Sequence, residues 1–244
     1  MKVVRCMSFM IYGKNSVLEA LKARRKFVKT YIQTGTNDDI ILKMNAAKIP
    51  VFFLEKKQFG EKYQGHNQGV VAEVEDYRTL TLEQFLTKTD ITQEPVILML
   101  DEIQDPHNLG AIVRSAEAGG VKAVIIPKNR SVGITPAVVK TASGAIEYVD
   151  IIEVVNLTQT AEKLKSEGYW IVGTTPDAKM SYEEIYIDRP LCVIIGNEGK
   201  GMGRLLKEHC DLLVKIPMRG RINSLNASVS AGIIIFDISR RKQG

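Results

Sequence analysis

Three segments of the sequence concentrate residue types that could bind a ligand or take part in a reaction. They are residues 101–116, 194–203 and 216–228. The first contains Asn108 and Arg114, an amide and a guanidinium that can orient a substrate or stabilise developing charge. The second packs four glycines into eight residues, which lets backbone approach a ligand closely. The third presents Arg219 and Arg221 on either side of a glycine, an arrangement that suits contact with phosphate.

The glycine cluster of the second segment first suggests a loop that cradles a nucleotide phosphate. Such a loop has four residues between its first glycine and a Gly-Lys-Ser/Thr ending, whose hydroxyl serves Mg²⁺. Here only two residues separate Gly196 from Gly199, and Lys200 is followed by Gly201, so the hydroxyl is missing. The spacing also departs from the dinucleotide-binding fingerprint. The sequence therefore argues against a nucleotide phosphate as the ligand of this loop.

The three segments follow stretches that are expected to be strands of one sheet. Residues 96–100 and 191–195 are continuously apolar, as in strands buried on both faces, and residues 213–216 are short and extended. Further strands are expected at 123–126 and 169–174, and helices at 108–118, 157–167 and 225–240. This alternation predicts an α/β fold with a mostly parallel sheet covered on both sides. Function in such sheets gathers beyond the carboxyl ends of the strands, so the segments are expected to meet there.

Local structure offers a simpler explanation for several of these polar residues. Asn108 is of a type that caps helices, and Asn223 or Ser224 could cap the final helix in the same way. Arg114 falls six residues into its helix, where a solvated or salt-bridged arginine would be ordinary. Each segment taken alone leaves both interpretations open.

The first third of the chain is expected to form a separate, smaller α/β unit. Helices are expected at 14–23 and 37–47, and strands at 27–33, 50–54 and 69–75. The polar stretch that follows has one short helix near residues 82–86 and reads as a linker. The predicted division is a first domain at residues 1–76, a linker at 77–94, and a second domain at 95–244.

Positive charge is concentrated in the smaller unit. Residues 1–80 hold 14 Lys and Arg against 8 Asp and Glu, whereas residues 81–244 hold 19 against 20. The excess includes Lys22, Arg24, Arg25 and Lys26. A run of this kind is often a solvated helix end, but a whole segment with this bias favours a polyanionic partner such as RNA or DNA.

Composition excludes several other classes of protein. No apolar run approaches the roughly 20 residues that span a bilayer, and the apolar stretch at the start is too short for a signal peptide. The three cysteines are far apart and lack metal-ligand spacing. They are interpreted as reduced thiols in a cytoplasmic protein without a metal site.

Taken together, the three segments resemble the motifs of the SpoU (TrmH) family of RNA ribose 2'-O-methyltransferases. The matching positions are Asp105, Pro106, Asn108, Gly110 and Arg114 in the first segment, Gly196, Asn197, Glu198, Gly199 and Gly201 in the second, and Ile216, Pro217, Met218, Gly220, Ser224, Leu225, Asn226 and Ser228 in the third. Residues 11–13 and 66–72 of the smaller unit resemble, more briefly, a small ribosomal-protein-like RNA-binding domain of one branch of that family. That branch contains the large-subunit rRNA guanosine 2'-O-methyltransferases.

The resemblance implies a fold, a cofactor and a substrate. It implies a trefoil knot in the second domain, a homodimer packed through that domain, and S-adenosylmethionine as methyl donor. The expected substrate is a guanosine ribose in 23S rRNA. A transfer RNA substrate and a non-enzymatic RNA-binding assembly factor are the alternatives. Retention of Asn108, Arg114, Glu198 and Asn226 argues against the latter.

The resemblance also implies roles for individual residues. The catalytic set is expected to be Arg114, Asn108, Glu198, Ser224 and Asn226. Cofactor contacts are expected at Ile195, Gly196, Asn197, Gly199, Ile216, Met218, Ser224 and Leu225, and RNA contacts at Lys22, Arg24, Arg25, Lys26, Arg219 and Arg221. The family assigns the matching arginine as base, yet arginine keeps its proton at ordinary pH. Arg114 therefore either lies in surroundings that strongly favour its neutral form, or it orients a phosphate or stabilises developing alkoxide.

Overall fold

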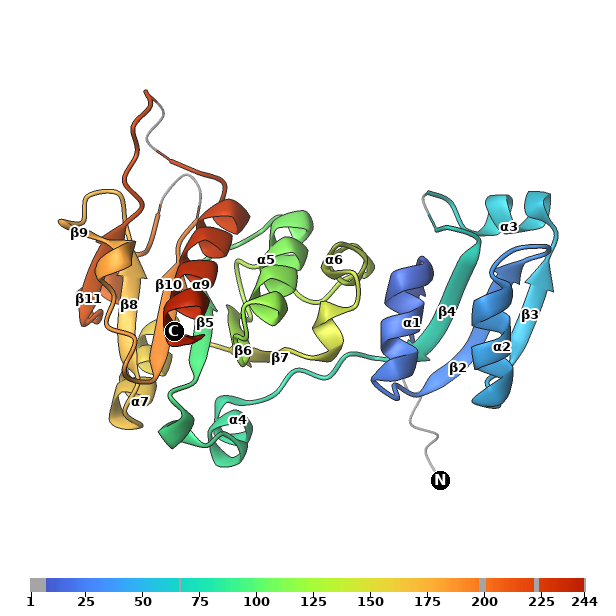
Figure 1. The fold of residues 1–244 in the computed structure, drawn as a ribbon, viewed down its shortest axis with the longest axis horizontal. Coiled ribbons are helices and arrows are strands. Elements are labelled where there is room, and N and C mark those ends of the chain that lie inside the picture. Colours follow the sequence, from blue (N-terminus) through green and yellow to red (C-terminus); the bar gives the residue numbers. More distant parts are fainter. Residues whose placement is uncertain (1–7, 66, 198–200, 222–223, 244) are drawn as a thin grey trace.

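The computed structural model describes residues 8–65, 67–197, 201–221 and 224–243, which form two β-sheets with their own helices, side by side along the long axis (Figure 1). In the part of the chain so described, no helix is long and apolar enough to cross a membrane.

The smaller sheet has four strands in the order β1-β4-β2-β3. Its strands are β1 (Ser8–Tyr12), β2 (Phe27–Gln33), β3 (Val51–Leu54) and β4 (Val70–Glu75). β4 runs antiparallel to both β1 and β2, while β2 and β3 are parallel. The last three were predicted, but β1 was not, because its five residues mix polar and apolar types and show no clear alternation.

The two faces of the smaller sheet are covered unequally. Helices α1 (Lys14–Lys22) and α2 (Asp38–Ala46) pack on one face, where Ile11 and Ile32 are fully buried. The short helix α3 (Lys56–Lys62) packs on the other face. Since seven residues cannot cover four strands, part of this second face stays open.

The larger sheet has seven strands in the order β7-β6-β5-β10-β8-β11-β9, and all its described pairs are parallel. They are β5 (Val96–Leu100), β6 (Ala123–Pro127), β7 (Asp150–Val154), β8 (Trp170–Thr174), β9 (Met180–Ser181), β10 (Leu191–Ile195) and β11 (Leu212–Lys215). The prediction of an α/β fold with a mostly parallel sheet is confirmed. β7 and the two-residue β9 were missed, since β7 is an edge strand interrupted by Glu153.

Helices cover both faces of the larger sheet (Figure 1). One face carries α5 (Pro106–Ala118), α6 (Pro136–Ala142) and α9 (Ala227–Gln243), and the other carries α4 (Leu82–Lys88), α7 (Leu157–Ser166) and α8 (Arg204–Glu208). Short 3₁₀ turns lie at η1 (Ile91–Gln93), η2 (Ala145–Glu147) and η3 (Tyr182–Glu184). Within the stretch expected to be a linker, Leu80 bridges to Ile152 and Phe85 is buried against this sheet.

A polar cluster joins the two units. The Arg25 guanidinium donates to both carboxylate oxygens of Glu147, at 3.0 and 2.8 Å, and lies 3.7 Å from the centroid of the Tyr77 ring. The Tyr77 hydroxyl donates to the same carboxylate at 2.7 Å. Beside it, the Tyr148 hydroxyl donates to Glu19 at 2.8 Å. The Glu147 side chain is only 3% exposed, so these contacts stabilise a carboxylate that is shielded from solvent.

Arg25→Ala is expected to lower the free energy of unfolding by about 3 kcal/mol, because it leaves the buried Glu147 carboxylate without its cation. Its neighbour Lys26 is a matched control, since its ion pair with Glu75 is largely exposed. Lys26→Ala is expected to cost less than about 1 kcal/mol. Urea unfolding measures both variants, and equal losses would contradict the assignment of Arg25 to the contact between the units.

Candidate cofactor and RNA site

A cavity of about 550 Å³ opens at the carboxyl edge of the larger sheet. Its walls come from the ends of β8, β10 and β11, from the loops that follow them, and from the start of α9. These segments lie together at the upper edge of the sheet in Figure 1. The parallel topology produces this gathering, because every strand ends at the same edge.

The structure brings the expected cofactor residues together around this cavity. Those that line it are Ile195, Gly196, Asn197, Ile216, Met218, Ser224 and Leu225. Gly199 lies outside the described residues. Residues chosen from two separate segments of the sequence thus surround one space, although their contacts with a cofactor stay a prediction.

Gly196 is in a position where only glycine fits. A Cβ added there would lie 2.6 Å from the carbonyl carbon of Gly201 and 2.7 Å from the amide nitrogen of Met202. Asn197 and Gly201 exchange two backbone hydrogen bonds, of 3.0 and 2.9 Å, which close the loop on itself. Gly201 has a φ of 66°, which glycine adopts without strain. The wall of the cavity is therefore backbone, with no side chain between it and a ligand at this point.

Side chains and backbone at the end of β5 anchor this loop. The Gly203 amide donates to the Asp101 carboxylate at 2.8 Å, and the Asn197 side chain donates to the Glu102 carbonyl at 3.0 Å. Burial raises the pKa of Asp101, although the hydrogen bond from Gly203 opposes that shift. The first segment thereby fixes the second.

The first and third segments meet through two amides. The Asn226 Nδ2 donates to Asn108 Oδ1 at 2.9 Å, while Asn226 Oδ1 accepts from the Ser228 amide at 2.9 Å. Asn226 rather than Ser224 thus caps α9. The cap of α5 is Asp105, whose carboxylate accepts from the His107 amide at 2.8 Å. The interpretation of Asn108 as a helix cap is therefore wrong.

The remaining expected catalytic residues are placed differently from one another. Ser224 lines the cavity. Arg114 is exposed on α5, does not line the cavity of its own chain, and has no hydrogen bond or ion pair among the described residues. Glu198 lies outside the described residues. Within one chain the structure therefore assembles Asn108 with Asn226, but not with Arg114.

Polar residues that sequence reasoning missed also line the cavity. Thr175 and Asp177 follow β8, and Lys207 is in α8. The Lys207 ammonium lies 2.6 Å from an Asp177 oxygen, and together with the Thr175 hydroxyl it lowers the pKa of Asp177 to about 2. The signal was available, because Thr174-Thr175-Pro176-Asp177 is a polar turn at the carboxyl end of a predicted strand.

The residues expected to contact RNA fall into two separate groups. Lys22, Arg24 and Lys26 are exposed around the turn between α1 and β2, whereas Arg219 and Arg221 are exposed in the loop between β11 and α9. Figure 1 places these two regions at opposite edges of the molecule. Arg25 is held in the contact between the units and is only 19% exposed. The structure does not bring the expected RNA contacts into one surface.

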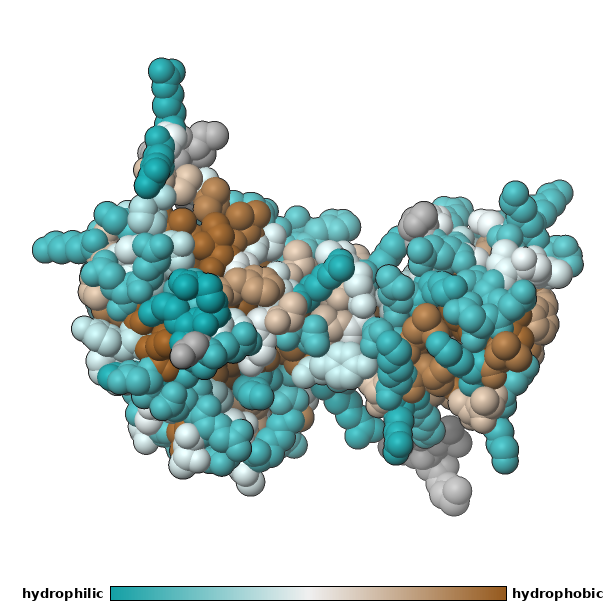
Figure 2. Space-filling model, viewed as in Figure 1, coloured by the Kyte–Doolittle hydropathy of each residue, from teal (hydrophilic) through white to brown (hydrophobic). Residues whose placement is uncertain are grey.

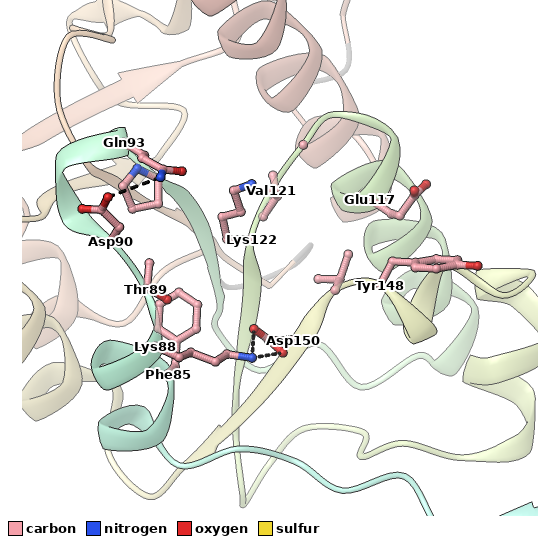
Figure 3. Close-up of a pocket in the computed structure, with 13 residues that line it drawn as sticks. Phe85, Lys88, Thr89, Asp90, Gln93, Glu117, Val121, Lys122, Tyr148 and Asp150 are labelled. Carbon is pink, nitrogen blue, oxygen red and sulfur yellow. Dashed lines mark hydrogen bonds and ion pairs between the residues drawn. The ribbon is translucent and has the colours of Figure 1, made fainter. Parts of the chain in front are cut away.

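A second cavity, of about 490 Å³, lies at the other edge of the larger sheet (Figure 3). Three of its charged residues are engaged in local structure. Lys88 of α4 pairs with Asp150 at the start of β7, at 2.7 Å, and Asp90 caps the turn η1. It contains none of the three segments, so we do not place the site there.

Comparison with known proteins agrees with the motifs. The SpoU rRNA Methylase family model matches residues 95–236, and the model for RNA 2'-O ribose methyltransferase substrate binding matches residues 10–80. The chain is 42% identical over 241 residues to the 23S rRNA (guanosine-2'-O-)-methyltransferase RlmB of Pseudomonas putida, covering 96% of both proteins. It is 40% identical over 237 residues to the TrmH family tRNA/rRNA methyltransferase YacO of Bacillus subtilis, covering 95% of both.

The solved structure of a similar protein contains a bound cofactor. The AdoMet-bound rRNA methyltransferase from Sinorhizobium meliloti has a TM-score of 0.81 and 25% identity, covering 96% of this chain and 87% of that one. The fold and the three segments thus define a methyltransferase that acts on RNA ribose and uses S-adenosylmethionine. The chain belongs to the SpoU methyltransferase family.

Gly196→Ala is expected to weaken binding of S-adenosylmethionine at least about tenfold, because the added methyl group overlaps backbone that cannot easily move. Gly220→Ala is the control, since a Cβ at Gly220 would meet nothing within 4 Å. Isothermal titration calorimetry with S-adenosylmethionine measures both. Unchanged affinity for Gly196→Ala would show that this wall does not shape the cofactor site.

Proposed function

We propose that this protein transfers a methyl group from S-adenosylmethionine to the ribose 2'-hydroxyl of a guanosine in 23S rRNA. The observation that carries the proposal is the end-to-end similarity to an enzyme named for that reaction, in a chain whose second and third segments surround one cavity. The proposal needs no metal ion, and places the reaction in the cytoplasm.

The cavity suits the cofactor in size and in wall chemistry. It offers backbone groups at Ile195, Gly196, Ile216 and Leu225. S-adenosylmethionine supplies an electrophilic methyl group on a sulfonium. The cationic sulfonium needs no phosphate-binding loop, consistent with the glycine spacing. We assign Asn197, Met218 and Ser224 to the same contact, and Gly199 on its motif alone.

The oxygen of the 2'-hydroxyl attacks the methyl carbon in line with the departing sulfur, so that a C–O bond forms as the C–S bond breaks, and the hydroxyl proton passes to solvent. The Asn108–Asn226 pair would hold the first and third segments in fixed register beside the cavity. Arg114 would orient the adjoining phosphate or stabilise the developing alkoxide, which suits a cation better than removal of the proton. We keep Ser224 and Glu198 in the catalytic set, the latter on its motif alone.

A homodimer would complete the site. Arg114 does not line the cavity of its own chain, so a second copy would have to present it. Val229 and Phe236 are about half exposed on one side of α9, one above the other at a spacing of seven residues. Figure 2 shows apolar residues gathered over this helix. Such a face supports packing of α9 against a partner's methyltransferase domain.

The division into domains belongs to the same proposal. Residues 1–76 would bind the RNA substrate, 77–94 would connect, and 95–244 would hold the cofactor, as the two family models suggest. The smaller unit would share the fold of a small ribosomal RNA-binding protein. A trefoil knot is supported by the closeness of the loops after β10 and β11, which wall the same cavity.

Transfer RNA is the second candidate substrate, because the Bacillus subtilis relative is named for both tRNA and rRNA. The predicted substrate-binding unit and the similarity to an rRNA enzyme favour rRNA.

Methyl transfer from labelled S-adenosylmethionine to naked 23S rRNA and, separately, to bulk transfer RNA tests the proposal. Label is expected on rRNA ribose after nuclease digestion. Arg114→Ala is expected to reduce transfer at least about 100-fold without loss of cofactor binding, whereas Glu117→Ala, also exposed on α5, is the control. Label on transfer RNA alone would replace the proposed substrate, and label on neither, with no cofactor binding, would refute the enzyme.

A further inference from the structure

The open face of the smaller sheet carries aromatic and basic side chains in adjacent rows. Strand register places Tyr12, Val71, Tyr31 and Phe52 in one row across β1, β4, β2 and β3. Lys29 lies in the next row, opposite Glu73. Because side chains alternate along a strand, all of these lie on the face opposite α1 and α2.

Helix α3 covers only part of this row. Phe59 and Tyr63 pack over Val71 and bury it, but Tyr31 is half-buried and Phe52 is 49% exposed. The rings of Tyr31 and Phe52 lie 5.7 Å apart and are tilted by 34°. Two neighbouring aromatic rings are thus accessible at the end of the sheet that is farthest from β1.

Two cations lie near the Tyr31 ring. The Lys62 ammonium is 4.4 Å from the centroid of the Tyr31 ring, and the Lys29 ammonium is 5.7 Å from it. Lys29 also pairs with Glu73 at 3.1 Å, whereas Lys62 is exposed and has no ion pair among the described residues. Glu73, which lies in the row of Lys29, is therefore already paired with a cation, and Lys62 adds a positive charge to this face.

We infer that this sheet face, defined by Tyr31, Phe52, Lys29 and Lys62, binds single-stranded RNA by base stacking, and so forms part of the substrate-binding surface. Aromatic rings on an open sheet with lysines beside them offer a stacking plane to a base and a cation to its phosphate. A duplex keeps its bases stacked internally and gains less from such a plane. The inference rests on the proposed function for the identity of the polyanion as RNA.

This assignment differs from the expectation drawn from the sequence. The basic run at residues 22–26 lies at the turn between α1 and β2, and its Arg25 is engaged with Glu147. The sheet face offers shape and stacking as well as charge. Exposed lysines alone would give only salt-dependent contact with phosphate.

Two adjacent phenylalanines provide the test. Phe52 and Phe53 are 49% and 54% exposed in the same strand, but Phe53 pairs in register with Ile32, which belongs to the core beneath α1 and α2. The probe is a fluorescein-labelled single-stranded oligouridine of about twelve nucleotides, bound to the full-length protein and followed by fluorescence anisotropy. Phe52→Ala is expected to weaken binding about tenfold, and Phe53→Ala to leave it unchanged.

A second variant separates stacking from charge. Lys62→Ala is expected to weaken binding and to reduce the salt dependence of the affinity by about one phosphate contact. Phe52→Ala should leave that dependence intact. Equal binding by Phe52→Ala and Phe53→Ala would overturn the inference. So would loss of self-association by Phe52→Ala, measured by sedimentation, without a change in oligonucleotide binding, because the face would then be a protein interface.

Failure of this inference can be distinguished from failure of the proposed function. Methyl transfer to 23S rRNA by Phe52→Ala is expected to show a raised KM for RNA with an unchanged kcat. If the unaltered protein methylates rRNA but Phe52→Ala binds the oligonucleotide normally, the inference fails and the function stands. If Phe52 is required for binding but no RNA is methylated, the surface stands and the function fails.

Discussion

The backbone of Gly196 approaches that of Gly201 and Met202 so closely that no side chain can stand between them, and the candidate site depends on this contact. β10 lies between β5 and β8, so the sheet fixes the position from which the loop departs. Any side chain at position 196 would push the loop away from the sheet and widen the cavity. The glycines therefore serve to shape a wall of backbone, which is a different use from the capture of a phosphate.

Parallel topology turns large separations in sequence into contact. Asn108 and Asn226 are 118 residues apart, yet their amides meet because each lies just beyond the carboxyl end of a parallel strand. Asp101 anchors Gly203 across a similar separation. In each case the order of the strands brings the two loops together. A side chain then makes a hydrogen bond between them that would be lost if either loop moved.

Sequence reasoning located what is coded locally and missed what depends on distant partners. β5 and β10 were predicted because strands buried on both faces form continuous apolar runs, which are easy to recognise. β7 was missed because Glu153 interrupts its apolar run, so that its composition resembles that of a loop. Asn108 was ambiguous because a cap and a site residue look alike until Asp105 is seen to cap the helix. Arg25 was read as one of a basic run, since no local pattern reveals a partner at Glu147.

The pairing of Arg25 with Glu147 couples the position of the smaller unit to that of helix α5. Glu147 belongs to η2, which follows α6, and α6 packs on α5 where Gly110 leaves no space for a Cβ against Val138. Helix α5 carries the candidate catalytic residues Asn108 and Arg114. A displacement of the smaller unit would have to break a nearly buried ion pair or move that helix. If the smaller unit holds RNA as proposed, that RNA would reach the proposed cofactor cavity at a set distance. Selection of the nucleotide would then depend on the geometry between the two surfaces as well as on the chemistry at either one.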